Sequence, residues 1–129
     1  MRTVEVVAAI IIKNNKYLCT QRGNNGGYTA LKWEFPGGKI EENETPEEAL
    51  KWEIQEELKS DIKVEEHFCT VDHTYPDIRL IMHVYLCSME DDDIILVEHN
   101  SYKWLSPSNL MGLDWAEADI PIVHKIIKK

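Results

Sequence analysis

The sequence reads GKIEENE at residues 38–44 and, after seven further residues, WEIQEE at residues 52–57. Glu53, Glu56 and Glu57 stand at positions i, i+3 and i+4, so a helix would carry all three carboxylates on one side. Their repulsion destabilises such a helix unless a bound divalent cation offsets it. Gly38, just upstream, lets the backbone approach the same cation or a phosphate. The stretch therefore predicts a helix with an acidic, metal-binding face.

The residues around this acidic face predict a capped helix that packs on a core. Thr45 fits the N-cap, Pro46 fits the first helical position, and Glu48 completes a capping box. An apolar stripe recurs every four residues beside the carboxylates and consists of Leu50, Ile54 and Leu58. We therefore expect the stripe to hold the helix on the core while the carboxylates line the edge of a cleft.

The rest of the chain consists of strand-like segments and one further helix. Apolar and β-branched patterns predict strands at residues 4–12, 17–22, 62–71, 78–87 and 101–105, with the third and fourth paired. The last helix is expected to begin near Asp119 and to bury Ile120, Val123, Ile126 and Ile127. Helices on either side of a mostly β middle predict an α/β fold, in the α+β sense, with a sheet covered by helices.

Size and charge narrow the kind of protein. With 129 residues, of which 43% are hydrophobic and 29% charged, the chain is expected to form a single domain over residues 1–129. The formal net charge of −9 argues against binding to a nucleic-acid duplex, which needs a basic face. It leaves room for a small phosphorylated substrate, because metal ions can supply positive charge. The absence of a membrane-length apolar run and of a signal-peptide pattern predicts a cytoplasmic protein with no membrane partner.

The cysteines and histidines give no sign of a further metal site. Cys19, Cys69 and Cys87 each lie in an apolar, strand-like run and form no Cys-x-x-Cys pair. We interpret them as buried, reduced thiols. The five histidines show no metal-ligand spacing and are assigned no role.

The spacing of one glycine and four glutamates resembles the Nudix box of the Nudix hydrolases: Gly38, Glu44, Glu53, Glu56 and Glu57. The family pattern is Gly-x5-Glu-x7-Arg-Glu-U-x-Glu-Glu-x-Gly-U, with U a bulky aliphatic residue. Other segments resemble the MutT and CTP pyrophosphohydrolase branch, namely VVAAI at 6–10, FPGGKIE at 35–41, ETPE at 44–47 and ADIP at 118–121. The resemblance extends over most of the chain. It implies a Nudix fold, an α/β/α sandwich in which helices flank a mixed β-sheet.

The sequence also departs from this pattern. Trp52 stands where the family has an arginine, Lys59 where it has the second glycine, and Ser60 where it has the final aliphatic residue. In the family that arginine orients the metal-binding glutamates, and such supporting contacts commonly change activity by about 10- to 100-fold. Lys59 removes the usual glycine after the helix, so the helix is expected to end differently. The departures imply slower hydrolysis unless another cation orients the glutamates.

The resemblance implies a hydrolase that depends on Mg²⁺, or on Mn²⁺ in its place, and that acts on a nucleoside diphosphate linked to another group. For this branch the reaction converts a nucleoside triphosphate and water into a nucleoside monophosphate and pyrophosphate. CTP-like or oxidised substrates such as 8-oxo-dGTP, and a role in nucleotide-pool sanitation, are expected. Two alternatives stay open: a catalytically weak nucleotide-binding module, suggested by Trp52, and a hydrolase of another nucleoside diphosphate derivative. Both a monomer and a homodimer agree with the sequence.

The resemblance also assigns roles to the acidic residues and their glycine. The expected metal ligands are Glu53, Glu56, Glu57 and Glu98, together with the backbone carbonyl of Gly38 or its neighbour Gly37. Glu53 or Glu57 is alternatively the catalytic base, and Glu98 is either a ligand or the base. The plainer interpretations are an exposed acidic helix face, a solvated loop acid at Glu98 and a turn glycine with positive φ at Gly38. Glu44, next to the N-cap, is expected to be structural.

Residues elsewhere are candidates for contacts to the nucleotide. Arg22 and Lys39 are expected to contact phosphates, unless they are ordinary surface charges. Phe35 and Tyr75 are expected to flank the base, with core packing as the alternative for Phe35. Asp119 is expected to contact the base edge, accepting from an amino group such as cytosine N4 when ionised and addressing an oxidised purine when protonated. Its alternative role is the N-cap of the last helix.

Overall fold

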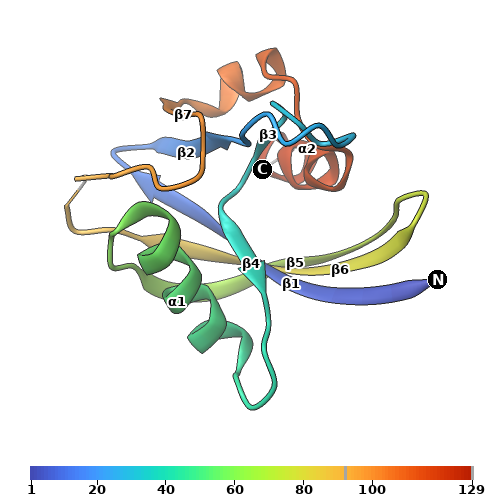
Figure 1. The fold of residues 1–129 in the computed structure, drawn as a ribbon. Coiled ribbons are helices and arrows are strands. Elements are labelled where there is room, and N and C mark those ends of the chain that lie inside the picture. Colours follow the sequence, from blue (N-terminus) through green and yellow to red (C-terminus); the bar gives the residue numbers. More distant parts are fainter. Residues whose placement is uncertain (92, 129) are drawn as a thin grey trace.

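Strand β1 (Arg2–Lys13) runs through the centre of the structure, a computed structural model that describes residues 1–91 and 93–128. It pairs in parallel with β6 (Ile78–Ser88) and antiparallel with β4 (Gly37–Lys39). Strand β5 (Lys63–Thr74) extends this group by antiparallel pairing with β6, as expected from the sequence. Parallel and antiparallel pairs in one sheet confirm the mixed sheet that the family resemblance implies (Figure 1).

After the C-terminal end of β1, the chain enters a second group of strands. A tight hairpin leads into β2 (Lys16–Gln21), which is flanked by β3 (Trp33–Glu34) and β7 (Ser101–Leu105). The bounds of β7 match the prediction, whereas β5 continues to Thr74 beyond its expected end at residue 71. The short strands β3 and β4 were not predicted, and they form the wall of the site described below.

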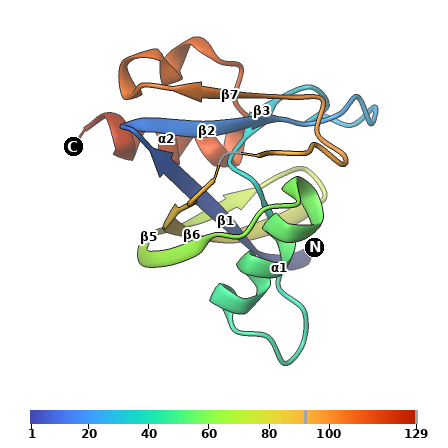
Figure 2. The same ribbon diagram turned by 90° about the vertical axis from the view of Figure 1, so that its left-hand side faces the viewer.

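Alternate residues of β1 face two separate cores, as the two-residue period of a strand requires. Val7, Ala9 and Ile11 pack in one core against helix α1 (Pro46–Leu58). Ala8 and Ile10 pack in the other, which includes helix α2 (Ile120–Ile127) and Leu110 from the 3₁₀ segment Pro107–Gly112. Figures 1 and 2 show the two helices on opposite sides of β1. The expected helix–sheet–helix sandwich is therefore confirmed.

Helix α1 forms as its sequence predicts. The Thr45 hydroxyl accepts a hydrogen bond from the Glu48 N–H at 3.1 Å, and the Glu48 carboxylate accepts one from the Thr45 N–H at 2.9 Å. The stripe of Leu50, Ile54 and Leu58 is fully buried. The helix still ends in a left-handed residue, but that residue is Lys59, with φ 53° and ψ 39°. Without a glycine, the helix was expected to end differently. That expectation is wrong, because the chain keeps the left-handed ending that a glycine favours and only places a lysine there.

Helix α2 presents a different face to the core from the one predicted. Ile120 and Ile127 are exposed, whereas Ile122, Val123 and Ile126 are buried, so the expectation for the first two is wrong. The reason lies in Asp119, whose buried carboxylate accepts a hydrogen bond from the Phe35 N–H. Residues 122, 123 and 126 lie three, four and seven positions after it, on the same helical side. The inward anchoring of Asp119 therefore sets the rotation of the helix.

The cysteines agree with the sequence interpretation in part. Cys19 and Cys87 are buried and Cys69 is half-buried, and all three are free thiols. Burial raises the pKa of the Cys19 and Cys87 thiols to about 12, which keeps them protonated.

Within residues 1–91 and 93–128, no helix is both long and apolar enough to cross a membrane.

Candidate active site

A cleft of about 520 Å³ opens between the two strand groups and helix α1. It brings together most of the site residues that the sequence predicts: Arg22, Phe35, Gly38, Glu57, Tyr75, Glu98 and Asp119. A second hollow of about 300 Å³ shares Glu57 and Glu98 with the cleft and adds Glu53 and Glu56. Lys39 is exposed on β4 and lines neither cavity. The carboxylates thus stand where the cleft meets the second hollow.

The glycines of β4 are required by close packing. A Cβ at Gly37 would lie 1.9 Å from the Val7 carbonyl oxygen, and a Cβ at Gly38 would lie 2.4 Å from the Glu53 carboxyl carbon. Both glycines belong to a strand, and neither has a positive φ, so the turn interpretation of Gly38 is wrong. Their role is to let the β4 backbone approach β1 on one side and the α1 carboxylates on the other.

Two carboxylates of α1 are held in surroundings that oppose their ionisation. Burial, followed by the charges of Glu34 and Glu53, raises the pKa of Glu57 to about 8, against a smaller lowering by the Gly37 backbone. Burial and the charges of Glu44 and Glu56 also raise the pKa of Glu53. The Oε1 atom of Glu57 is buried and finds no hydrogen-bond partner among the described residues. Such crowded oxygen ligands suit a hard divalent cation, which would supply the missing positive charge.

The carboxylates are nevertheless divided between the two cavities, because Glu57 and Glu98 line both while Glu53 and Glu56 line only the second hollow. Within the described ranges, no group of three or more His, Cys, Asp or Glu side chains is arranged as a ready metal site. The orphaned oxygen of Glu57 and the close approach of Gly38 to Glu53 are the observations that fit a cation here. Glu56 is more exposed and lines only the second hollow.

The segment that carries Glu98 is tied to both sides of the cleft. The Val97 N–H donates to the Glu57 carbonyl at 3.2 Å, and the Asn100 N–H donates to the Gln21 carbonyl at 2.8 Å. Glu98 itself is exposed and lines both cavities. Its backbone is therefore fixed, while its carboxylate is free to face a ligand.

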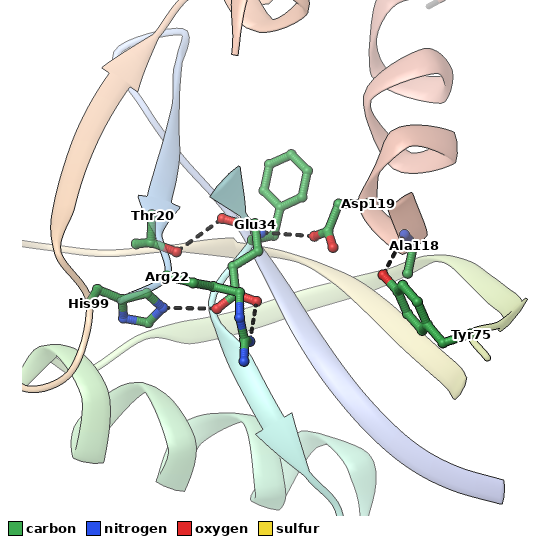
Figure 3. A network of polar contacts seen from close by, with 8 residues as sticks. Thr20, Arg22, Glu34, Tyr75, His99, Ala118 and Asp119 are labelled. Carbon is green, nitrogen blue, oxygen red and sulfur yellow. Dashed lines mark hydrogen bonds and ion pairs between the residues drawn. The ribbon is translucent and has the colours of Figure 1, made fainter. Parts of the chain in front are cut away.

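Glu34 and His99 form a largely buried pair that the sequence does not predict. One Glu34 oxygen accepts from Arg22 Nη1 at 3.0 Å, and the other accepts from His99 Nε2 at 2.9 Å (Figure 3). The His99 side chain is 5% exposed, so the expectation of no role for this histidine does not hold for the structure. The only sequence signals were their positions, directly before Phe35 and directly after Glu98.

Asp119 and Tyr75, which also line the cleft, each accept a hydrogen bond from a backbone N–H. The Asp119 carboxylate accepts from the Phe35 N–H at 2.9 Å, and the Tyr75 hydroxyl accepts from the Ala118 N–H at 3.0 Å (Figure 3). Asp119 occupies the N-cap position of α2 but makes no side-chain capping bond. Burial, then the charge of Glu34, raises the pKa of Asp119 well above its ordinary value.

The aromatic side chains differ in how available they are. Phe35 is 3% exposed and stacks on Trp115 with ring centroids 4.9 Å apart, so it also serves the core. Tyr75 stacks instead on Tyr28, at 5.0 Å, and the Tyr28 hydroxyl donates to Asp77 at 2.6 Å. Tyr28 comes from the loop after β2 and was not predicted. It lines the cleft and closes over Tyr75 from the solvent side.

Comparisons with known proteins agree with this architecture. A family model described as a NUDIX domain matches residues 6–125. The chain is 35% identical to the CTP pyrophosphohydrolase of Escherichia coli (strain K12), over 96% of this chain and 91% of that protein. It is 31% identical to an 8-oxo-dGTP diphosphatase of Buchnera aphidicola, over 99% and 96%. A solution structure of the MutT protein, a Nudix hydrolase, from methicillin-resistant Staphylococcus aureus 252 superposes with a TM-score of 0.78 at 43% identity, covering 99% and 98%.

Proposed function

The chain belongs to the NUDIX domain family, and from that premise we propose that residues 1–129 act as a nucleoside triphosphate pyrophosphohydrolase. The reaction adds water to a nucleoside triphosphate and releases a nucleoside monophosphate and pyrophosphate. Relatives named CTP pyrophosphohydrolase and 8-oxo-dGTP diphosphatase support this class of substrate. The observation that carries it is the position of Glu57, whose Oε1 is buried without a partner among the described residues, where the cleft meets the second hollow near β4.

Nudix hydrolases use divalent metal ions, and we propose Mg²⁺, or Mn²⁺ in its place, for this chain. Glu53, Glu56, Glu57 and Glu98 would hold the ion, with the carbonyl of Gly38 beside them. When bound, the ion neutralises charge on the leaving pyrophosphate and lowers the pKa of the attacking water. Glu53, Glu57 and Glu98 are the groups able to accept the proton that this water loses.

The rest of the cleft would orient the nucleotide. We place the base near Asp119 and Tyr75 and the phosphates toward Glu57, because all three residues line one cavity and Glu57 also faces the second hollow with the other carboxylates. Arg22 lines the same cavity and supplies donors for a phosphate. Lys39, outside the cavity, would reach only a group that projects from it.

Asp119 is the proposed contact to the base edge. Its raised pKa favours the protonated acid, which can donate a hydrogen bond to an oxidised purine such as that of 8-oxo-dGTP. The ionised form accepts from an amino group, as on the cytosine of CTP. Both fit a role in clearing unwanted nucleotides from the cytoplasmic pool.

A nucleotide panel tests this function. The protein is incubated with Mg²⁺ and CTP, 5-substituted dCTP, 8-oxo-dGTP or dGTP, and the monophosphate and pyrophosphate are quantified. We expect turnover of at least one of them, and Glu57→Gln should reduce kcat strongly while the fold persists. Release of orthophosphate alone, or an unchanged rate in Glu57→Gln, contradicts the proposal.

The exposure of Trp52 favours a second candidate, a nucleotide-binding module with little catalysis. Trp52 is 60% exposed at the position where the family has its orienting arginine. This candidate predicts binding of a nucleotide by calorimetry with no product over hours. Measurable turnover in the panel excludes it.

A further inference from the structure

Glu34 connects two chain segments that border the cleft, the one that carries Arg22 and the one that carries Glu98. We propose that Glu34 is a positioning residue, which aims Arg22 at the substrate phosphates and, through His99, fixes the segment that carries Glu98. The inference rests on the proposed function for its kinetic consequences. Its structural content stands on contacts between residues 34, 22 and 99 alone.

The first contact fixes the direction of Arg22. Strand β3 pairs with β2 so that Glu34 lies opposite Thr20, whose hydroxyl donates to the Glu34 carbonyl at 2.9 Å. The Glu34 carboxylate then holds Arg22 Nη1 at 3.0 Å. Arg22 Nε is buried with no partner among the described residues, and the side chain lines the cleft. The guanidinium is thus held at one nitrogen and keeps further donors for an anion.

The second contact fixes the Glu98 segment from inside. His99 Nε2 donates to the other Glu34 oxygen at 2.9 Å, and the ring is almost completely buried. The same segment is also held by two backbone hydrogen bonds, from the Val97 N–H to the Glu57 carbonyl and from the Asn100 N–H to the Gln21 carbonyl. His99 lies between Val97 and Asn100 and next to Glu98. Its hydrogen bond to Glu34 therefore limits how far the Glu98 backbone can move.

Both contacts need a carboxylate. Glu34 is 18% exposed and accepts one hydrogen bond at each oxygen. Arg22 Nη1 can only donate, and His99 Nε2 donates in the tautomer that carries its proton on that nitrogen. Glutamine has nearly the same shape, but it offers one acceptor oxygen and an NH₂ group. That NH₂ group faces either Arg22, which cannot accept, or His99 Nε2, which accepts only if the ring proton moves to Nδ1, a buried atom with no partner among the described residues. Glu34→Gln should therefore lose one of the two contacts, with little change in packing.

Steady-state kinetics separate the two contacts. We expect Arg22→Ala to raise KM mainly, His99→Gln to lower kcat mainly, and Glu34→Gln to do both, with kcat/KM reduced by about 10- to 100-fold. Because Glu34 acts through the other two, adding Glu34→Gln to the Arg22→Ala, His99→Gln double variant should change little. Asp72→Asn, which breaks the exposed ion pair with Arg79, is the matched control and should match the wild type.

Hydrogen–deuterium exchange gives a readout that needs no activity. Amides of residues 97–100 should exchange faster in Glu34→Gln and His99→Gln, and not in Arg22→Ala or Asp72→Asn. If Glu34→Gln fails to fold, Glu34→Asp, which keeps the charge but shortens the reach, takes its place. Unchanged exchange in these amides, or wild-type kcat and KM, overturns the positioning role. A wild type that turns over no nucleotide overturns the proposed function instead, and exchange still decides whether Glu34 fixes the segment.

Discussion

The carboxylate of Asp119 accepts a hydrogen bond from the backbone N–H of Phe35 at 2.9 Å and joins the start of helix α2 to the strand wall of the cleft. Asp119 is buried, and the charge of Glu34 lies close enough to raise its pKa further. One side chain therefore aligns the helix, supports the wall and faces the cleft. Its ionisation should affect both stability and the choice of substrate.

Stability should depend on pH through Asp119. Its folded-state pKa is raised well above the ordinary value of 3.8, so the folded chain binds more protons than the unfolded chain above that pH. The free energy of unfolding attributable to Asp119 must then fall as the pH rises toward the raised pKa. Asp119→Asn keeps an acceptor oxygen for Phe35 without the charge. We expect it to be more stable than the wild type at pH 8 by about 1–3 kcal/mol, and by less near pH 4.

Urea denaturation at several pH values, with a chelator present, checks this expectation. The difference between variant and wild type isolates Asp119 from the other titrating carboxylates. A difference that is constant with pH, or a variant that loses stability as pH rises, contradicts it.

Metal affinity should depend on pH through Glu57. The Glu57 pKa of about 8 means that a metal ion must displace a proton at neutral pH. The affinity for Mg²⁺ should therefore fall by about tenfold for each pH unit below that pKa. Calorimetry between pH 6 and 8 measures it. Glu57→Gln should bind weakly at every pH, while Glu66→Gln, on the exposed surface of β5, should follow the wild type. An affinity independent of pH would remove Glu57 from the ligand set.

The parts of the fold that sequence predicts well are those set by neighbours along the chain. The capping box of Thr45 and Glu48 and the stripe beneath it involve residues within one helix, so their spacing is sufficient. Glu34 and His99 are 65 positions apart, and nothing near either residue indicates the other. The same limit explains Ile120, because the rotation of α2 depends on a hydrogen bond between Asp119 and the backbone of Phe35, which lies between β3 and β4 and is distant in sequence. The sequence therefore predicts which residues line the cleft better than it predicts the contacts among them.

The left-handed Lys59 marks a position where stability can be gained. A side chain in this conformation is strained by its Cβ, and glycine is not. We expect Lys59→Gly to raise the free energy of unfolding by about 0.5–1 kcal/mol. Lys51→Gly, at an exposed position inside the same helix, is the opposite control and should cost about 1 kcal/mol. Denaturant titration of both variants decides. If the two substitutions destabilise equally, strain at Lys59 is negligible.

Trp52 offers a direct test of whether the carboxylates lack an orienting cation. Trp52 is 60% exposed and lines the second hollow with Glu53 and Glu56. The charged groups that act on Glu53 are all acidic, and with burial they raise its pKa. An arginine at this position would place positive charge among these groups. We expect Trp52→Arg to raise kcat by about tenfold or more, since orienting contacts have effects of that size.

The same substitution should stabilise the metal-free protein, because it relieves repulsion on the helix, by about 0.2–0.5 kcal/mol. Tyr102→Arg, on exposed β7, adds the same charge away from the carboxylates and should change neither quantity. A rise in stability without a rise in kcat would mean that the arginine relieves repulsion but does not orient ligands. Equal effects of the two arginines would mean that net charge alone matters. Only a gain in kcat specific to position 52 shows that the carboxylate face of α1 is complete in its ligands and deficient in their orientation.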